Sequence, residues 1–137
     1  MQNTIGRKLV SLLVGSLLFV AGCRAAQQPA TTEKTLMHVF AYTPLEGATS
    51  QDFENFKKAT EGMVGKIPGL RRVWVGKLRE PLPAATAADP RLYGVAMEFD
   101  DVKALEVYAD HPAHLEWVKV YEKVRVRGTT TLDILSE

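Results

Sequence analysis

Two histidines and a tyrosine lie close together in the stretch YADHPAHLEW, which runs from Tyr108 to Trp117. A neutral imidazole can remove a proton next to a carbonyl group when it lies about 3 Å away. A nearby phenol could donate a hydrogen bond to the enolate oxygen that forms. Tyr108, His111 and His114 follow one another at intervals of three residues, so on helices they could share one wall of a pocket.

The same stretch also has a purely structural interpretation. Asp110 or His111 could cap a helix, and Pro112 would then fit in its first turn, where its missing N–H costs nothing. His111 would in that case link two helices without taking part in chemistry. The sequence leaves three roles open for this stretch: a helix joint, contact with a ligand through Tyr108 and His114, or catalysis by these two residues.

The elements that must position these residues follow from periodicity. Apolar and β-branched runs bounded by turn residues predict four strands, at residues 35–42, 70–78, 91–99 and 124–135. A bulge is expected at Gly128 in the last strand. Residues 79–90 hold three prolines and four alanines without a strand pattern, so this segment is expected to be a loop.

Helices are predicted between these strands. Thr49 and Asp52 form a capping box before a helix whose buried face is marked by Phe53, Phe56, Thr60, Met63 and Ile67. Asp100 or Asp101 caps a short second helix, and a third carries an inner face of Leu115, Val118 and Tyr121. The order β-α-β-β-α-β is the ferredoxin-like α+β pattern, with a four-stranded antiparallel sheet.

Both faces of the predicted sheet are apolar. The first strand alone places Met37, Val39 and Ala41 on the face opposite to Phe40 and Tyr42. A solvated second face would alternate apolar and polar residues more cleanly. One face must cover the helices, and the chain is too short to supply another layer for the second face. We therefore expect a second copy to cover it, which makes the protein a homodimer.

The first 22 residues predict an export signal. Arg7 and Lys8 precede an uncharged apolar run, LVSLLVGSLLFVAG, which spans Leu9–Gly22. At 14 residues the run is shorter than the roughly 20 needed for a transmembrane helix, as is usual for a secretory signal. Residues 24–34 are small and polar, and with Cys23 they are expected to form a flexible tether before the folded domain.

The signal ends in VAGC, and Cys23 is the only cysteine in the chain. A lone cysteine in an exported protein has no partner for an intramolecular disulfide. The four residues resemble the lipobox of bacterial lipoproteins, which implies cleavage before Cys23 and a lipid on its sulfur. The alternative is a plain signal peptide with an incidental cysteine. The resemblance implies attachment to a membrane of the bacterial cell envelope. The residue after the cysteine is Arg24 rather than Asp, which favours the outer membrane.

Three segments together resemble the stress-responsive A/B barrel family, also called the Dabb domain. They are the strand MHVF, the turn PGL followed by VWVGK, and YGVAMEFDDVKALEVYADHPAHLEWV, which spans Tyr93–Val118. The resemblance covers about residues 35–135 and implies a Dabb domain at 35–137. It also implies that two ferredoxin-like monomers pack their sheets into a dimeric α+β barrel.

A plant member of this family is a polyketide cyclase, which closes a linear poly-β-keto thioester by aldol condensation. Its reaction uses a tyrosine and a histidine in the segment that corresponds to YADHPAH. Carried over by position, these are Tyr108 and His114, which become the candidate catalytic residues. His38 matches a further histidine position of that enzyme, so His38 and His111 become candidate ligand contacts.

Other functional classes find little support in the sequence. The formal net charge of +1 provides no basic surface for nucleic acid. A catalytic zinc site usually needs three protein ligands, and His38 is the only histidine besides His111 and His114, so no metal is expected. No glycine-rich phosphate loop or Rossmann fingerprint predicts a cofactor. Arg125 and Arg127 are expected on a solvated strand face, and an anion site there is the alternative. The two tryptophans are expected in the core or at the dimer interface.

Three functions therefore remain open. The first is a lipid-anchored homodimer that binds a small apolar or phenolic ligand. The second is a cyclase-, isomerase- or monooxygenase-like enzyme that uses Tyr108 and His114. The third is a non-catalytic assembly protein of the envelope, in which side chains would fill the barrel. The space beside His38, Tyr108 and His114 distinguishes these functions, because it must be open in the first two and plugged in the third.

Overall fold

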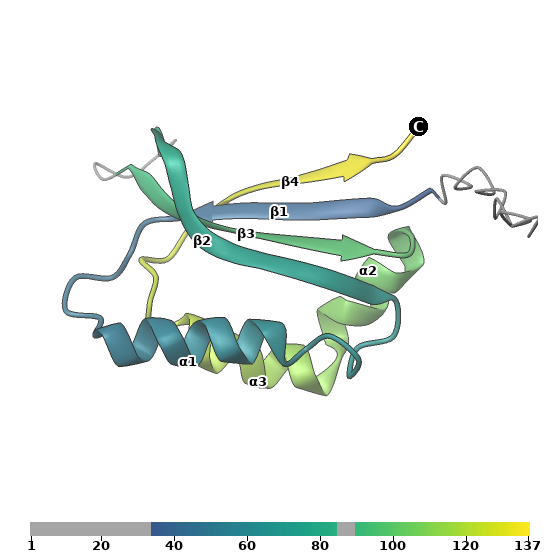
Figure 1. Cartoon of the computed structure of the whole chain (residues 1–137), viewed down its shortest axis with the longest axis horizontal. Coiled ribbons are helices and arrows are strands. Elements are labelled where there is room, and N and C mark those ends of the chain that lie inside the picture. Colours follow the sequence, from purple (N-terminus) through teal and green to yellow (C-terminus); the bar gives the residue numbers. More distant parts are fainter. Residues whose placement is uncertain (1–33, 85–89) are drawn as a thin grey trace, which may run out of the picture. The chain divides into compact units, whose positions relative to one another are not determined.

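The computed structural model describes residues 34–84 and 90–137 (Figure 1). The predictions for the export signal, for Cys23 and for most of the tether lie outside the described residues. The elements are β1 (Leu36–Tyr42), α1 (Ser50–Glu61), β2 (Leu70–Leu82), β3 (Arg91–Phe99), α2 (Val102–Asp110), α3 (Pro112–Tyr121) and β4 (Thr130–Leu135). Among the described residues, no helix is long and apolar enough to cross a membrane.

The four strands form one antiparallel sheet in the order β2-β3-β1-β4. The three helices all lie on one face of this sheet, as Figure 1 shows. This arrangement confirms the predicted ferredoxin-like α+β fold, with the second helical segment divided into α2 and α3. The predicted capping box is also confirmed, because Thr49 accepts from the backbone N–H of Asp52 and the Asp52 carboxylate accepts from that of Thr49.

The core lies between the inner face of the sheet and the helices. Aromatic residues dominate it, and those that are buried are Phe40, Tyr42, Phe56, Phe99, Tyr108, Trp117 and Tyr121. The inner face of α3 matches the prediction at Tyr121, which is buried, but Leu115 is 53% exposed and Trp117 is buried instead. The two bulky aromatic rings meet Phe56 of α1, so burying them rather than Leu115 removes more apolar surface from water.

Two strand boundaries were predicted wrongly. β2 continues to Leu82, which pairs with Arg91, so the first part of the expected loop is strand. β2 is an edge strand, where Pro81 is tolerated because one side of the strand needs no ladder hydrogen bonds. β4 begins only at Thr130 rather than at Val124, and Gly128 has a φ of +90° in the connection before the strand rather than in a bulge.

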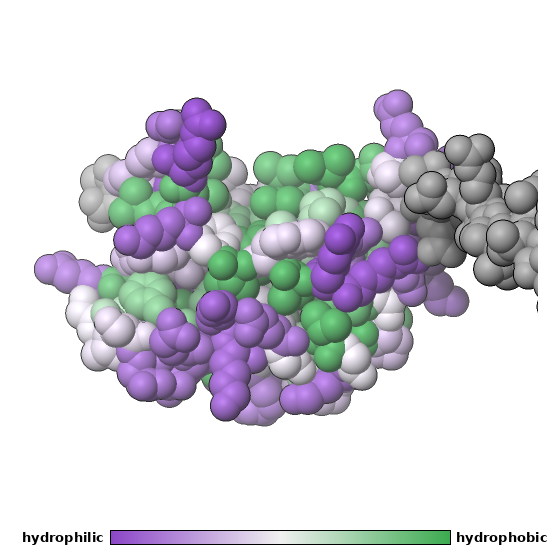
Figure 2. Space-filling view, in the orientation of Figure 1, coloured by the Kyte–Doolittle hydropathy of each residue, from purple (hydrophilic) through white to green (hydrophobic). Residues whose placement is uncertain are grey.

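None of the described helices lies on the outer face of the sheet. This face carries Val39 in the centre, flanked by its cross-strand partners Ala96 and Leu132. Trp74, which pairs with Ala96, is 45% exposed on this face, and Leu132 and Ile134 are exposed as well. Figure 2 shows hydrophobic surface over the sheet, above the helices. An apolar surface of this kind in a folded domain marks an interaction site.

Candidate functional site

A cavity of about 390 Å³ lies between the β1–β4 half of the sheet and the helices α2 and α3. Its walls are largely apolar or aromatic, with a few polar side chains, which is the usual composition of a small-molecule site. The lining residues are His38, Phe40, Leu105, Tyr108, Ala109, His114, Trp117, Val118, Tyr121, Arg125, Thr129 and Thr131. The space beside the three residues singled out from the sequence is therefore open in the described protomer.

The rings of His38, Tyr108 and His114 lie in series along one wall. The Tyr108 and His114 rings are 4.0 Å apart between centroids, and the His38 and Tyr108 rings are 6.2 Å apart. Tyr108 lies near the end of α2 and His114 in the first turn of α3, so the break between the helices folds the two rings onto each other. His38 reaches the same wall from β1.

His111 takes no part in this cavity. It caps α3, and its Nδ1 accepts a hydrogen bond of 3.1 Å from the backbone N–H of Ala113. Pro112 occupies the first turn of α3, as the structural interpretation predicted. The structure thus places the His111 ring at the start of a helix and outside the lining of this cavity, and a ligand contact by His111 stays a prediction.

The protonation states of His114 and Tyr108 are set by burial and by one hydrogen bond. The Nδ1 of His114 lies 3.0 Å from the carbonyl oxygen of Ala109. A carbonyl can only accept, so Nδ1 carries the hydrogen and Nε2 of the neutral ring has a free lone pair. Burial lowers the pKa of His114 below its ordinary value. Burial also raises the pKa of Tyr108, which keeps its hydroxyl protonated.

Asp133 belongs to the site although the sequence did not single it out. It stands opposite His38 in the β1–β4 pair, and its Oδ1 lies 2.6 Å from Nδ1 of His38. The carboxylate accepts from Nδ1, which leaves Nε2 of His38 as the second imidazole nitrogen for a ligand. The available signal was one acid within the otherwise neutral strand TTLDIL, but its partner depends on the strand register.

Arg125 lies at another part of the cavity wall. Its guanidinium stacks on the ring of Tyr121 at 4.4 Å, and its side chain is only 17% exposed. This corrects the predicted solvated strand face for Arg125, because the residue lies in the connection between α3 and β4 and turns inward. Arg127 is 88% exposed, as that prediction required. Both arginines form ion pairs with Glu122.

The family model for the stress responsive A/B barrel domain, Dabb, matches residues 36–134. The chain belongs to the Dabb family. The match covers nearly every residue that the structure describes, including all four strands. A comparison with the curated proteins found no match.

Solved structures similar to this Dabb domain share its fold at low sequence identity. A dimeric ferredoxin-like protein from Jannaschia sp. is 21% identical, with a TM-score of 0.59 over 73% of this chain and 97% of its own. A Dabb family protein from Mesorhizobium loti is 20% identical, with a TM-score of 0.54 over 76% and 98%. A hydroxynitrile lyase from Passiflora edulis is 13% identical, with a TM-score of 0.62 over 77% and 95%.

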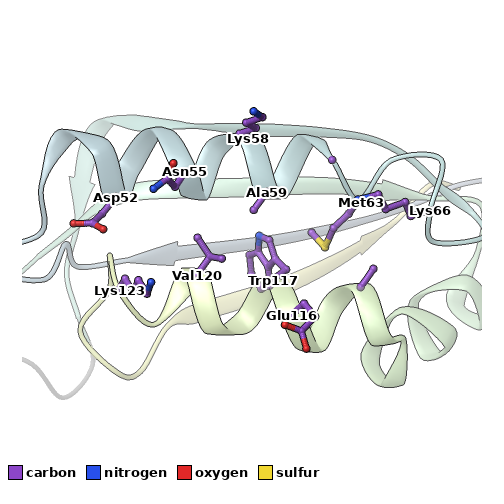
Figure 3. A pocket seen from close by; sticks show the side chains of 12 residues that line it. Asp52, Asn55, Lys58, Ala59, Met63, Lys66, Glu116, Trp117, Val120 and Lys123 are labelled. Carbon is purple, nitrogen blue, oxygen red and sulfur yellow. The ribbon is translucent and has the colours of Figure 1, made fainter.

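A larger groove of this Dabb domain, about 680 Å³, lies between α1 and α3 (Figure 3). Trp117 forms part of its floor, and its indole Nε1 donates a hydrogen bond of 2.8 Å to Thr60 Oγ1. Figure 3 shows the charged side chains spread along the groove, with Lys58 turned away from it. These charges do not converge on one point, whereas three polar rings of the smaller cavity, those of His38, Tyr108 and His114, follow one another along one wall. Within the described residues, no three acidic, histidine or cysteine side chains are placed to hold a metal ion.

Proposed function

We propose that this protein is a lipid-anchored Dabb homodimer that binds a small apolar or phenolic molecule in the cavity beside His38, Tyr108 and His114. The observation that carries the proposal is the open, aromatic cavity of about 390 Å³ with these three polar groups on one wall. The third function considered from the sequence, a barrel filled by side chains, is less compatible with this open space.

The wall offers complementary hydrogen-bonding groups to a phenol. Nε2 of the neutral His114 can accept the hydrogen of a phenolic hydroxyl. The hydroxyl of Tyr108 has no hydrogen bond with a described residue, so it can donate to the same ligand oxygen. Phe40 and Trp117, whose ring centroids lie 6.0 Å apart, provide an apolar surface for the rest of the molecule.

The homodimer is supported by the uncovered outer face of the sheet and by the dimeric state of similar structures. Two sheets packed through Val39, Trp74 and Leu132 would bury the apolar side chains that a monomer leaves in water. The lipid anchor is supported by the sequence alone, through the VAGC motif at Cys23. On this proposal the ligand site lies at a membrane of the bacterial cell envelope.

A second candidate function, acid–base catalysis, is favoured by the protonation states of Tyr108 and His114. His114 would remove a proton from the carbon next to a ligand carbonyl through Nε2, and the Tyr108 hydroxyl would donate a hydrogen bond to the enolate oxygen. The Passiflora edulis hydroxynitrile lyase has the same fold and is an enzyme. Fold alone does not carry activity from one protein to another.

Calorimetric titration of the full chain in detergent with 2-naphthol tests the binding function. Tyr108→Phe and His114→Gln should each weaken binding by about fivefold to tenfold, because each removes one hydrogen bond to the ligand. His111→Asn is the matched control, since it replaces a histidine outside the cavity by another good helix cap. Equal affinities in all four proteins, or no binding to the wild type, would contradict the proposal.

Catalysis is tested separately with acetophenone in D₂O. If His114 removes a methyl proton, mass spectrometry should show deuterium entering the methyl group faster with the wild type than with buffer. His114→Gln should return the exchange rate to that of buffer, while the His111→Asn control should not. Binding of 2-naphthol without any exchange would assign the protein to the binding function.

A further inference from the structure

We propose that the part of the cavity wall at Arg125 is an anion subsite, which takes the carboxylate of an aromatic or aliphatic acid. The proposal rests on the proposed small-molecule function and adds the chemical class of the ligand. It follows from a concentration of buried polar atoms without partners around Tyr121.

Four buried side-chain atoms of the described residues lack a hydrogen-bond partner. They are the hydroxyls of Tyr42 and Tyr121 and the Nε atoms of Arg91 and Arg125. Nearly all buried polar groups in folded proteins are hydrogen-bonded, because leaving one unpaired costs free energy. Several such atoms in one region indicate that a polar group is missing there.

These four residues form one cluster. The rings of Tyr42 and Tyr121 are 5.2 Å apart, and the guanidinium of Arg125 stacks on Tyr121. Arg91 and Arg125 both act electrostatically on the Tyr121 hydroxyl. Gly128, in the same connection as Arg125, lies close to the Arg91 guanidinium, since a Cβ built there would be 3.8 Å from Nη2. The cluster therefore joins the start of β3 to the connection that follows α3.

The charges in this cluster do not balance. Arg91 is only 3% exposed, and its one side-chain hydrogen bond, of 3.2 Å, goes to the neutral hydroxyl of Thr43. Within the described residues Arg91 forms no ion pair, and the single carboxylate of Glu122 is shared by Arg125 and Arg127. A buried cation is costly unless an anion accompanies it. The cluster is thus suited to a second anion.

The described cluster meets the cavity at Arg125 and Tyr121. These two residues line the cavity, whereas Arg91 is not part of its lining and adds positive potential. The Arg125 guanidinium lies over the Tyr121 ring, and its planar fork matches the two oxygens of a carboxylate. Because the remaining wall includes Phe40 and Trp117, the ligand is expected to carry its acid group on an aromatic or aliphatic body.

The test compares 1-naphthaleneacetate with its uncharged amide, 1-naphthaleneacetamide, by calorimetric titration of the full chain in detergent. The two probes differ only in the group that would meet Arg125. The wild type should bind the acid about tenfold more tightly than the amide. Arg125→Gln should bring this ratio close to one, because it weakens binding of the acid more than binding of the amide, and Arg91→Gln should lower the ratio partly. The acid and the amide partition differently into micelles, but this difference is the same for every protein, so it cancels when the ratio is compared between proteins.

Arg127→Gln is the matched control. Arg127 also pairs with Glu122, so the substitution removes the same charge, but from an exposed side chain. It should keep the acid preference of the wild type. Equal binding of both probes to the wild type would overturn the anion subsite and leave the binding function intact. An acid preference that survives Arg125→Gln, or that disappears equally in Arg127→Gln, would also overturn it. If neither probe binds, the small-molecule function fails together with the subsite.

Discussion

Nδ1 of His38 lies 2.6 Å from Oδ1 of Asp133, and the two residues stand directly opposite each other on β1 and β4. The pair joins residues 95 positions apart in the chain. It holds the His38 ring at the cavity wall, where Tyr108 is the neighbouring ring. An imidazole whose Nδ1 donates to a carboxylate has a defined tautomer, so Nε2 presents a lone pair to a ligand.

Asp133→Ala should weaken the binding of 2-naphthol by about threefold to tenfold, because it frees the His38 ring to rotate. The loss of affinity should be smaller than the loss caused by breaking a fully buried ion pair, since Asp133 is half-exposed. Asp100→Ala is the control, because it removes an equally exposed carboxylate from the ion pair with Arg71. Titration calorimetry of the three proteins checks the prediction, and equal losses in both variants would contradict it.

The free energy of unfolding should fall as the pH is lowered from about 6.5. Burial lowers the folded-state pKa of His114 below 6.5, so below this pH the unfolded chain binds more protons at this residue than the folded chain does. Stability therefore increases with pH through the window between the two pKa values and stays level above it. The lowered pKa values of Asp52 and Glu122 act in a separate window at more acidic pH.

Urea unfolding at a series of pH values measures this dependence. His114→Gln should remove most of the slope just below about pH 6.5, whereas wild type and variant should run parallel above about pH 7.5. A slope that is unchanged in His114→Gln would show that another group is responsible.

Val39→Asp should dissociate the proposed dimer while leaving each domain folded. Val39 lies at the centre of the outer sheet face, so in a dimer the new carboxylate would be buried without a partner. Val107→Asp is the matched control, because it makes the same change at an exposed position of α2. Phe40→Asp, on the inner face and 4% exposed, should instead prevent folding.

Light scattering and circular dichroism distinguish these outcomes. We expect a dimeric mass for the wild type and for Val107→Asp, and a monomeric mass with native helix content for Val39→Asp. A wild-type protein that stays monomeric at high micromolar concentration would rule out the dimeric barrel.

Cys23→Ser should release the protein from the membrane fraction or leave it uncleaved, because a serine hydroxyl cannot form the thioether with diacylglycerol. Fractionation of bacterial cells, with immunoblotting of both fractions, measures the change. The mass of the purified wild-type protein should also exceed that of the processed polypeptide by the attached lipid. A correctly cleaved Cys23→Ser protein that remains in the membrane would contradict the lipid anchor.

The element order, the capping box of Thr49 and Asp52, and the extent of β3 were all predictable from the sequence. Each depends on residues a few positions apart, whose propensities and side-chain hydrogen bonds act locally. The apolar character of both sheet faces was also predictable, because side-chain direction alternates along a strand. The sequence grouped Tyr108, His114 and His38 as one site only through the resemblance of the chain to the Dabb family.

Tertiary structure alone decided which polar groups share the cavity. Asp133 meets His38 through the register of two strands from opposite ends of the chain, and no local pattern contains that register. Arg125 turns inward because the chain after α3 crosses the end of the core before β4 begins, so strand parity misplaced it. His111 and His114 lie three residues apart and were both candidates, yet His111 caps α3 and His114 lines the cavity. Which of the two rings faces the cavity depends on the direction in which α3 leaves α2, and packing against the sheet sets that direction.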